Sequence, residues 1–116
     1  MDQDKLKDCI RLCWEARHAC QETLFRHCLP IGGAHMEEAH VRLMTDCISA
    51  CQMAADFMTR GSSLYEVVCA TCADICEACA KSCENIGDDS LMKCAKSCRA
   101  CAKSCRNTIS KMRAAA

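Results

Sequence analysis

The residues of this 116-residue chain most able to do chemistry are its 15 cysteines, because cysteine thiolates bind soft metal ions. Their spacing is regular: six pairs have the form Cys-x-x-x-Cys and three the form Cys-x-x-Cys. On a helix, such neighbours have Cβ atoms about 5–6 Å apart, so two thiolates converge on one ion. The candidate ligands are Cys9, Cys13, Cys20, Cys28, Cys47, Cys51, Cys69, Cys72, Cys76, Cys79, Cys83, Cys94, Cys98, Cys101 and Cys105.

Charge balance favours one metal over the others. Thiolates select Cu(I), Zn(II) or iron–sulfur clusters. A four-cysteine zinc site carries a net charge of about −2, and burying several such sites in a dry core is costly. Cu(I) is monovalent and accepts two or three thiolates, so about one ion per cysteine leaves the core near neutral. The compact cysteine run typical of bacterial ferredoxins is absent from the sequence, so iron–sulfur clusters are disfavoured.

Two alternatives to copper remain open. One is a zinc or general thiophilic-metal buffer, which metal content after expression distinguishes from a copper protein. The other is a disulfide-bearing redox or structural helical protein, which a thiol count distinguishes. The odd number of cysteines argues against disulfides. Residues 1–7 also lack the pattern of an export signal, which argues against an oxidising compartment. We therefore expect a cytoplasmic protein with reduced thiols.

Two histidines extend the candidate metal site. His27 and His40 fall on the expected core face, close in sequence to Cys28, and neutral imidazole is a competent copper ligand. We expect them at one end of the structure, where they bind copper or mark where it enters. The other two histidines, His18 and His35, are expected on the surface.

The methionines have two interpretations. Met44 and Met58 fall on the expected core face, where methionine commonly fills gaps, although its thioether also holds Cu(I) weakly. Met58 and Tyr65 are expected to plug the end opposite to His27 and His40.

These residues must be positioned by helices. Cysteine, alanine and larger apolar residues recur at alternating steps of three and four, the 3.5-residue period of helices that pack side by side. The pattern predicts helices over about 3–28, 35–60, 64–85 and 89–112. We call the residues that recur with this period the stripe of each helix. The stripe of the first predicted helix ends in Cys20, Thr23 and His27, with Cys28 beside it, and the stripe of the fourth reaches Met112.

Turn residues separate the four predicted helices. Pro30 is expected to stop the first helix, while Gly61 and Gly87 follow the second and third at the position where glycine often ends a helix. The segment 63–66 matches a capping box for the third helix. Asp88 and Asp89 are expected to cap the fourth.

Short connections force sequential helices to run in opposite directions. The sequence thus predicts an all-α fold: an antiparallel up-down-up-down four-helix bundle with a cysteine-lined core, a single domain over 1–116. Balanced charge, with 15 basic and 15 acidic residues, and only four aromatic residues argue against nucleic-acid binding. No stretch of about 18 apolar residues is present to span a membrane.

Several sequence runs resemble a known family, and together they cover nearly the whole chain. The chain is similar to the cysteine-rich four-helix-bundle copper-storage proteins, most of all to their cytosolic branch. The matching runs are His27 to Leu29, Gly32-Gly33, His35, His40, Leu43 to Cys47, Ala55 to Met58, Cys69 to Cys79 and Cys98 to Cys101.

The resemblance implies a tube of core cysteines that binds many Cu(I) ions, a homotetramer, and storage or detoxification of copper rather than catalysis. All 15 cysteines would be ligands, with His27 and His40 as secondary ligands near the open end. A copper chaperone is a candidate partner for delivery or removal. The last loop, 85–89, has no histidine or cysteine, so any ligand that relatives carry there would be missing.

Overall fold

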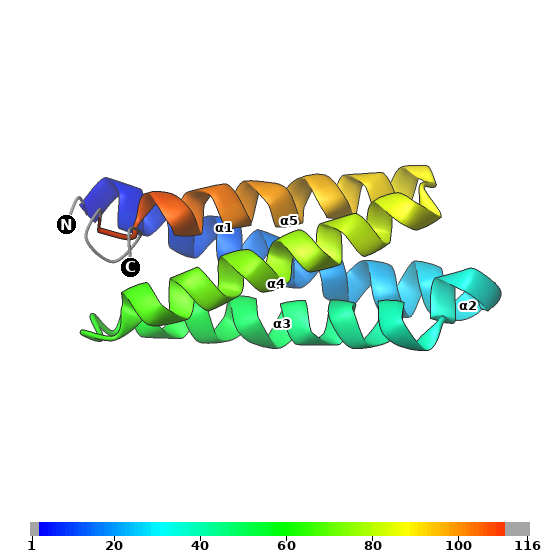
Figure 1. The fold of residues 1–116 in the computed structure, drawn as a ribbon, viewed down its shortest axis with the longest axis horizontal. Helices are drawn as coiled ribbons and strands as arrows, with labels where there is room; N and C mark the ends of the chain where they lie inside the picture. Colours follow the sequence, from blue (N-terminus) through cyan, green and yellow to red (C-terminus); the bar gives the residue numbers. More distant parts are fainter. Residues whose placement is uncertain (1–2, 111–116) are drawn as a thin grey trace.

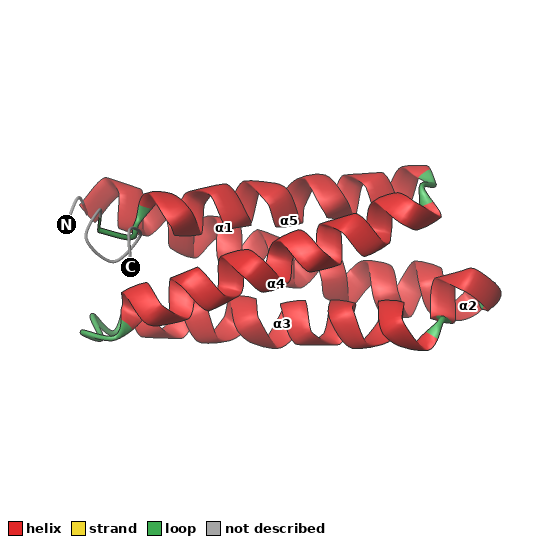
Figure 2. Ribbon diagram, in the orientation of Figure 1, coloured by secondary structure: helices red, strands yellow, loops and turns green. Residues whose placement is uncertain are grey.

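The computed structural model describes residues 3–110, and over this range the chain is helical apart from short turns (Figure 2). The elements are α1 (Gln3–Glu22), a π-helical turn (Thr23–Cys28), α2 (Leu29–Ile31), a 3-10 turn (Gly33–Met36), α3 (Glu38–Thr59), α4 (Tyr65–Ile86) and α5 (Asp89–Asn107). The predicted all-α class is confirmed.

The four long helices form a closed antiparallel bundle (Figure 1). α1 packs against α3 and α5, and α4 packs against the same two helices, so every long helix has two neighbours. The molecule measures 43 × 25 × 20 Å, with the helices along its longest dimension. The segment between α1 and α3 and the loop between α4 and α5 lie at the same end, while the α3–α4 loop lies at the other. The predicted up-down-up-down topology is confirmed.

Glycine and aspartate mark several helix boundaries as expected. Gly61 has φ 68° just after α3, and Gly87 has φ 82° at the end of α4, a region that residues with a Cβ atom rarely adopt. Asp88 caps α5, because its carboxylate accepts the Leu91 N–H at 3.0 Å. These signals bracket α3, α4 and the start of α5.

Two boundary predictions are wrong. The 63–66 capping box does not form, because the Glu66 carboxylate accepts instead from the N–H and hydroxyl of Ser110, and α4 begins without a side-chain cap. The fourth helix was expected to run to about residue 112 but ends at Asn107. The Thr108 hydroxyl bonds back to the Cys105 carbonyl, which satisfies one of the last helical acceptors. Met112 lies outside the described residues.

The first helix also differs from its prediction, because it continues through Pro30 to Ile31. A π-helical turn precedes the proline, and its wider backbone relieves the clash between the ring and the preceding turn. The same turn holds more residues per revolution, so the core-facing positions become Leu24 and Cys28. Thr23 is only half-buried, although the stripe placed it inside.

Gly87 offers a test of the helix end. In Gly87→Ala, the added Cβ would lie 3.3 Å from the Glu84 carbonyl oxygen, at a positive φ. We expect the free energy of unfolding to fall by about 1–2 kcal/mol. Urea unfolding of the reduced, metal-free protein measures the change. Lys96→Ala, at an exposed α5 position, is the control expected to change stability by less than about 0.5 kcal/mol. Equal stability of Gly87→Ala and the parent would contradict this account of the turn.

Within residues 3–110, no helix combines the length and the apolar character that crossing a membrane requires.

Candidate metal centre

Every cysteine of the chain lies in the bundle core as a free thiol. None is more than 2 % exposed, so the sulfur atoms are shielded from water along the whole bundle. α4 and α5 contribute most of them because their stripes are almost entirely cysteine. The predicted cysteine-lined core is confirmed.

The thiols contact one another across the helices. Sulfur–sulfur distances between contacting cysteines range from 3.4 Å, for Cys20 and Cys98, to 4.0 Å, for Cys47 and Cys51. At one end, Cys105 lies 3.7 Å from Cys9. In the middle, Cys47 contacts Cys98 at 3.8 Å and joins α3 to α5. The sulfurs form a continuous array rather than isolated pairs.

Within this array, groups of three or four sulfur atoms lie within 4.8 Å of one another. Such groups come from three or four different helices, as expected for ligands that meet at the axis of a bundle. They are Cys9, Cys69 and Cys105; Cys13, Cys72, Cys101 and Cys105; Cys51, Cys72, Cys76 and Cys101; and Cys20, Cys47, Cys79 and Cys98.

The groups overlap, and the overlap limits the number of separate metal sites that they can form. Cys72 and Cys101 each belong to two four-cysteine groups. At most two of these groups are therefore independent, each able to form one closed tetrahedral site. Binding about one ion per sulfur requires ions that share thiolates as bridging ligands.

Distance alone does not select the metal. Four thiolates around zinc, with bonds of about 2.3 Å, lie about 3.8 Å apart, and three thiolates in a plane at the same bond length lie about 4.0 Å apart. Both values match the spacing of the array. The charge that each arrangement leaves in the dry core remains the discriminating quantity.

Hydrogen bonds among the thiols shift their pKa values in opposite directions. The pKa of Cys20 is raised by hydrogen bonds with Cys47 and Cys79, and burial adds to the shift. The pKa of Cys47 is lowered by hydrogen bonds with Cys20 and Cys51. A thiolate formed in the array is therefore stabilised by hydrogen bonds from the protonated thiols around it.

At the end near the α4–α5 loop, the array changes from sulfur to imidazole. His40 Nε2 lies 3.8 Å from Cys28 Sγ, and His40 Nδ1 lies 2.7 Å from Ser82 Oγ. Burial lowers the pKa of His40, which keeps its imidazole neutral. When Nδ1–H donates to Ser82, the Nε2 lone pair faces the thiol. Burial also raises the pKa of Cys28 to about 11, with the Asp88 carboxylate adding to the shift.

The structure places His27 with partners that the sequence did not identify. His27 Nε2 and His35 Nε2 lie 2.9 and 2.6 Å from the same Asp88 oxygen, Oδ2. Hydrogen bonds from His35 and His27, and from the Leu91 N–H, hold the pKa of the Asp88 carboxyl well below its usual range. His27 and His40 thus lie at the same end but in different clusters. His35 was expected on the surface, yet its side chain is only 16 % exposed because it packs into this cluster.

The remaining predicted positions are also located. His18 is exposed and pairs with Glu22, as expected of a surface histidine. Met44 and Met58 are both buried in the core, with Met44 between His40 and Cys47 along the α3 stripe. Tyr65 is half-buried at the opposite end of the bundle from His40.

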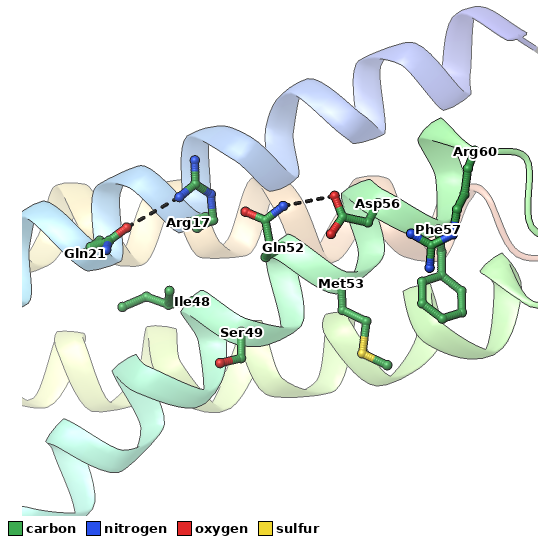
Figure 3. A pocket seen from close by; sticks show the side chains of 9 residues that line it. All are labelled: Arg17, Gln21, Ile48, Ser49, Gln52, Met53, Asp56, Phe57 and Arg60. Carbon is green, nitrogen blue, oxygen red and sulfur yellow. Dashed lines mark hydrogen bonds between the residues drawn. The ribbon is translucent and has the colours of Figure 1, made fainter.

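The surface also carries a groove between α1 and α3, but it has no metal-binding character (Figure 3). Its polar side chains pair with one another: Arg17 donates to Gln21, and Gln52 donates to Asp56. The Arg60 guanidinium lies 4.6 Å from the centre of the Phe57 ring. The groove is lined by no cysteine or histidine. The groups of metal-ligating side chains among the described residues lie in the core and at the end near His27 and His40.

Comparison with solved structures supports the same arrangement. The fold matches the Nmul_A1745 protein of Nitrosospira multiformis with a TM-score of 0.87 and 42% identity, covering 91% of this chain and 95% of that one. It matches a structure described as the Cu(I)-bound copper storage protein BsCsp3 with a TM-score of 0.85 and 33% identity, covering 91% and 99%. It also matches apo-Csp3 from Bacillus subtilis with a TM-score of 0.80 and 35% identity, covering 90% and 98%.

Sequence comparison agrees with the structural matches. The chain is 36% identical over 75 residues to the uncharacterised cysteine-rich protein YhjQ of Bacillus subtilis strain 168, covering 65% of this chain and 68% of that protein. The family described as copper storage protein, Csp, matches residues 2–110. With a four-helix bundle, a core of sulfur and this match over nearly its whole length, the chain belongs to the copper storage protein family.

Proposed function

We propose that this protein stores copper by binding many Cu(I) ions to the thiolates of its core. The observation that carries the proposal is the core of 15 buried free cysteines, most of which contact another cysteine with their sulfurs 3.4–4.0 Å apart. Thiolate bridging lets this array hold many monovalent ions in contact. Membership of the copper storage family supports the same function. All 15 cysteines are proposed as ligands, with His27 and His40 as secondary ligands.

A zinc or general thiophilic-metal buffer is the alternative to exclude. Each tetrahedral zinc site would leave about two uncompensated negative charges in a core whose described buried residues include no lysine or arginine. The deciding experiment is the metal content of protein expressed with equal copper and zinc supplementation. Copper in large excess over zinc supports storage of copper, and zinc in excess overturns it. A thiol count on freshly prepared protein tests the disulfide alternative.

The position of the thiols supports storage rather than catalysis. A catalytic thiolate must reach its substrate, whereas these sulfurs are enclosed by four helices. We therefore infer a non-enzymatic protein that operates in the reducing cytoplasm, with a copper chaperone as the partner for delivery or removal. An assay for copper transfer from a loaded chaperone tests the partnership.

A homotetramer is the proposed assembly, on the family resemblance. Several large apolar side chains lie on the surface and are available for burial between subunits. Sedimentation analysis of the reduced protein tests the assembly. The exposed apolar residues include Trp14, Phe25, Met53, Leu64, Val67 and Met92.

Copper is proposed to enter at the end that carries His27 and His40. Replacing both with leucine should slow Cu(I) loading about tenfold, because imidazoles that accept the ion on its way to Cys28 are lost. Capacity should change little, since the thiols remain. Stopped-flow transfer from a chromophoric Cu(I) chelator measures the rate.

His18→Leu is the matched control for this experiment, because His18 is an exposed histidine away from that end. It should load at the parental rate. Equal rates in the His27/His40 double variant and the parent would show that copper reaches the thiols by another route. The single variants His27→Leu and His40→Leu separate the two histidines, which lie in different clusters.

A further inference from the structure

A second group of metal-ligating side chains lies at the same end of the bundle, outside the sulfur array. It consists of the His27 and His35 imidazoles and the Asp88 carboxylate, whose ligand atoms all lie within 4.8 Å of one another. The group contains nitrogen and oxygen donors only. Its chemistry therefore differs from that of the thiolates beneath it.

The geometry of the group is close to that of a coordinated cation. Two imidazole Nε2 atoms converge on one carboxylate oxygen, at 2.9 and 2.6 Å, and the two rings meet edge to face with centroids 5.3 Å apart. Around a zinc-sized ion with bonds of about 2.0 Å, tetrahedral ligand atoms lie about 3.3 Å apart. Outward shifts of a few tenths of an ångström would admit such an ion.

The fold fixes each ligand before any metal arrives. Asp88 caps α5 through its other oxygen, Oδ1, which accepts the Leu91 N–H and leaves Oδ2 facing the histidines. His27 lies in the π-helical turn, which directs Cys28 into the core and His27 toward the α4–α5 loop. His35 lies in the 3-10 turn before α3. Three separate segments thus meet at one point.

We propose that His27, His35 and Asp88 form a separate binding site for one divalent cation of borderline hardness, with Zn²⁺ as the chemical type. Two neutral imidazoles and one carboxylate match the ligand preference of such ions and keep an open position for water. Soft monovalent Cu(I) prefers the neighbouring thiolates. The bound cation would tie the α1–α3 connection to the α4–α5 loop across this end of the bundle.

In the metal-free state, each Nε2–H donates to Asp88. Binding requires the proton of each imidazole to move to Nδ1, so that Nε2 can donate its lone pair to the metal. The net charge of the group changes from −1 to +1 when the dication joins the single carboxylate.

Cobalt(II) is the probe that distinguishes this site from the thiolates. The full chain is first loaded anaerobically with Cu(I) to one ion per cysteine, and its copper content is measured before Co²⁺ is added. We expect about one Co²⁺ per chain, with visible ligand-field bands but without the near-ultraviolet charge-transfer band of a cobalt–thiolate bond. Zn²⁺ should displace the cobalt and remove the visible bands.

Variants assign the ligands. Asp88→Asn keeps a side-chain oxygen to cap α5 but loses the anionic ligand, and His35→Ala removes an imidazole; each should weaken Co²⁺ binding by at least about tenfold. His18→Ala is the matched control, because His18 also faces a carboxylate, Glu22, at 3.4 Å. Circular dichroism and copper capacity verify that each variant is folded.

A direct readout does not depend on copper. Addition of Zn²⁺ to the reduced protein should shift the imidazole ¹⁵N resonances of Nε2 in His27 and His35, and leave those of His18 unchanged. The proposal is overturned if these resonances do not respond, if cobalt shows only thiolate charge transfer, or if His35→Ala binds Co²⁺ as the parent does.

Discussion

Anaerobic titration of the reduced protein should saturate at about one Cu(I) per cysteine, close to the 15 thiols of the chain. Each monovalent ion that replaces a thiol proton leaves the core charge unchanged, so loading can continue along the array without accumulating charge. The contacting sulfurs provide bridging ligands at every step. Competition with a chromophoric Cu(I) chelator measures the capacity and the affinity together.

Zinc should behave differently in the same titration. Only two of the four-cysteine groups are independent, so tight zinc binding to the thiolates should saturate at about two ions per chain, in addition to the one ion proposed at His27, His35 and Asp88. Cu(I) should displace the zinc from the thiolates. Saturation at one or two Cu(I) per chain would contradict storage and indicate a copper chaperone. Zinc capacity equal to that of copper would contradict the charge argument.

Substitutions within the array provide the matched test of capacity. Cys98→Ser removes a sulfur that contacts both Cys20 and Cys47, and should lower the Cu(I) capacity by about one or two ions rather than abolish it. Ser97→Ala, at the adjacent α5 position, should retain the parental capacity. Complete loss of binding in Cys98→Ser would show a single cooperative cluster in place of an extended array.

The sequence was sufficient to predict the bundle because its strongest signal is local. The step of three and four residues recurs in every long helix, and most of the residues on it are buried, including every cysteine from Cys9 to Cys105. Gly61 and Gly87 follow the ends of helices because the turn at each position needs a positive φ angle, which glycine adopts readily. Such features depend on neighbours in the chain and can be found without knowing the fold.

The departures have a different origin. The Glu66 carboxylate bonds to Ser110, a residue 44 positions away, and no local pattern signals that competition with a capping box. The π-helical turn before Pro30 shifts the buried position from Thr23 to Leu24, since it changes the helical period at a point where a constant period was assumed.

The cluster of His27, His35 and Asp88 was missed for a related reason. Asp88 was interpreted only as a helix cap, and the absence of histidine and cysteine from loop 85–89 suggested that the loop offers no ligand. An antiparallel bundle nevertheless places the first and third connections at the same end. Combining the predicted topology with the polar residues of both connections would have placed this carboxylate near the histidines.

The metal-free bundle already has the requirements of a stable fold. Protonated cysteine acts as a small apolar core residue, and the core also contains several buried alanines together with Leu91 and Met44. The α3 and α5 N-termini are capped by Glu37 and Asp88. We therefore expect folding not to depend on metal, in contrast to zinc fingers, in which metal binding supplies the folding free energy.

We expect far-ultraviolet circular dichroism of the reduced, chelator-treated protein to show a helical spectrum with a cooperative thermal transition. Full loading with Cu(I) should raise the transition temperature by more than about 20 °C. Each ion held at a free concentration a thousandfold above its dissociation constant adds about 4 kcal/mol, and a domain of this size gains a few degrees per kcal/mol. Removing copper with an excess of chelator should return the transition to its original temperature.

The size of the shift also reports where copper binds. Ions that bridge thiolates of different helices bind the native state in preference to the unfolded chain, since unfolding separates residues such as Cys20 and Cys98 that lie 3.4 Å apart. Copper bound only by pairs within one helix would stabilise little, because such pairs persist in local structure. A random-coil spectrum before copper is added would mean that metal drives folding. A folded apo-protein with an unchanged transition on loading would mean that the ions bind outside the interhelical array.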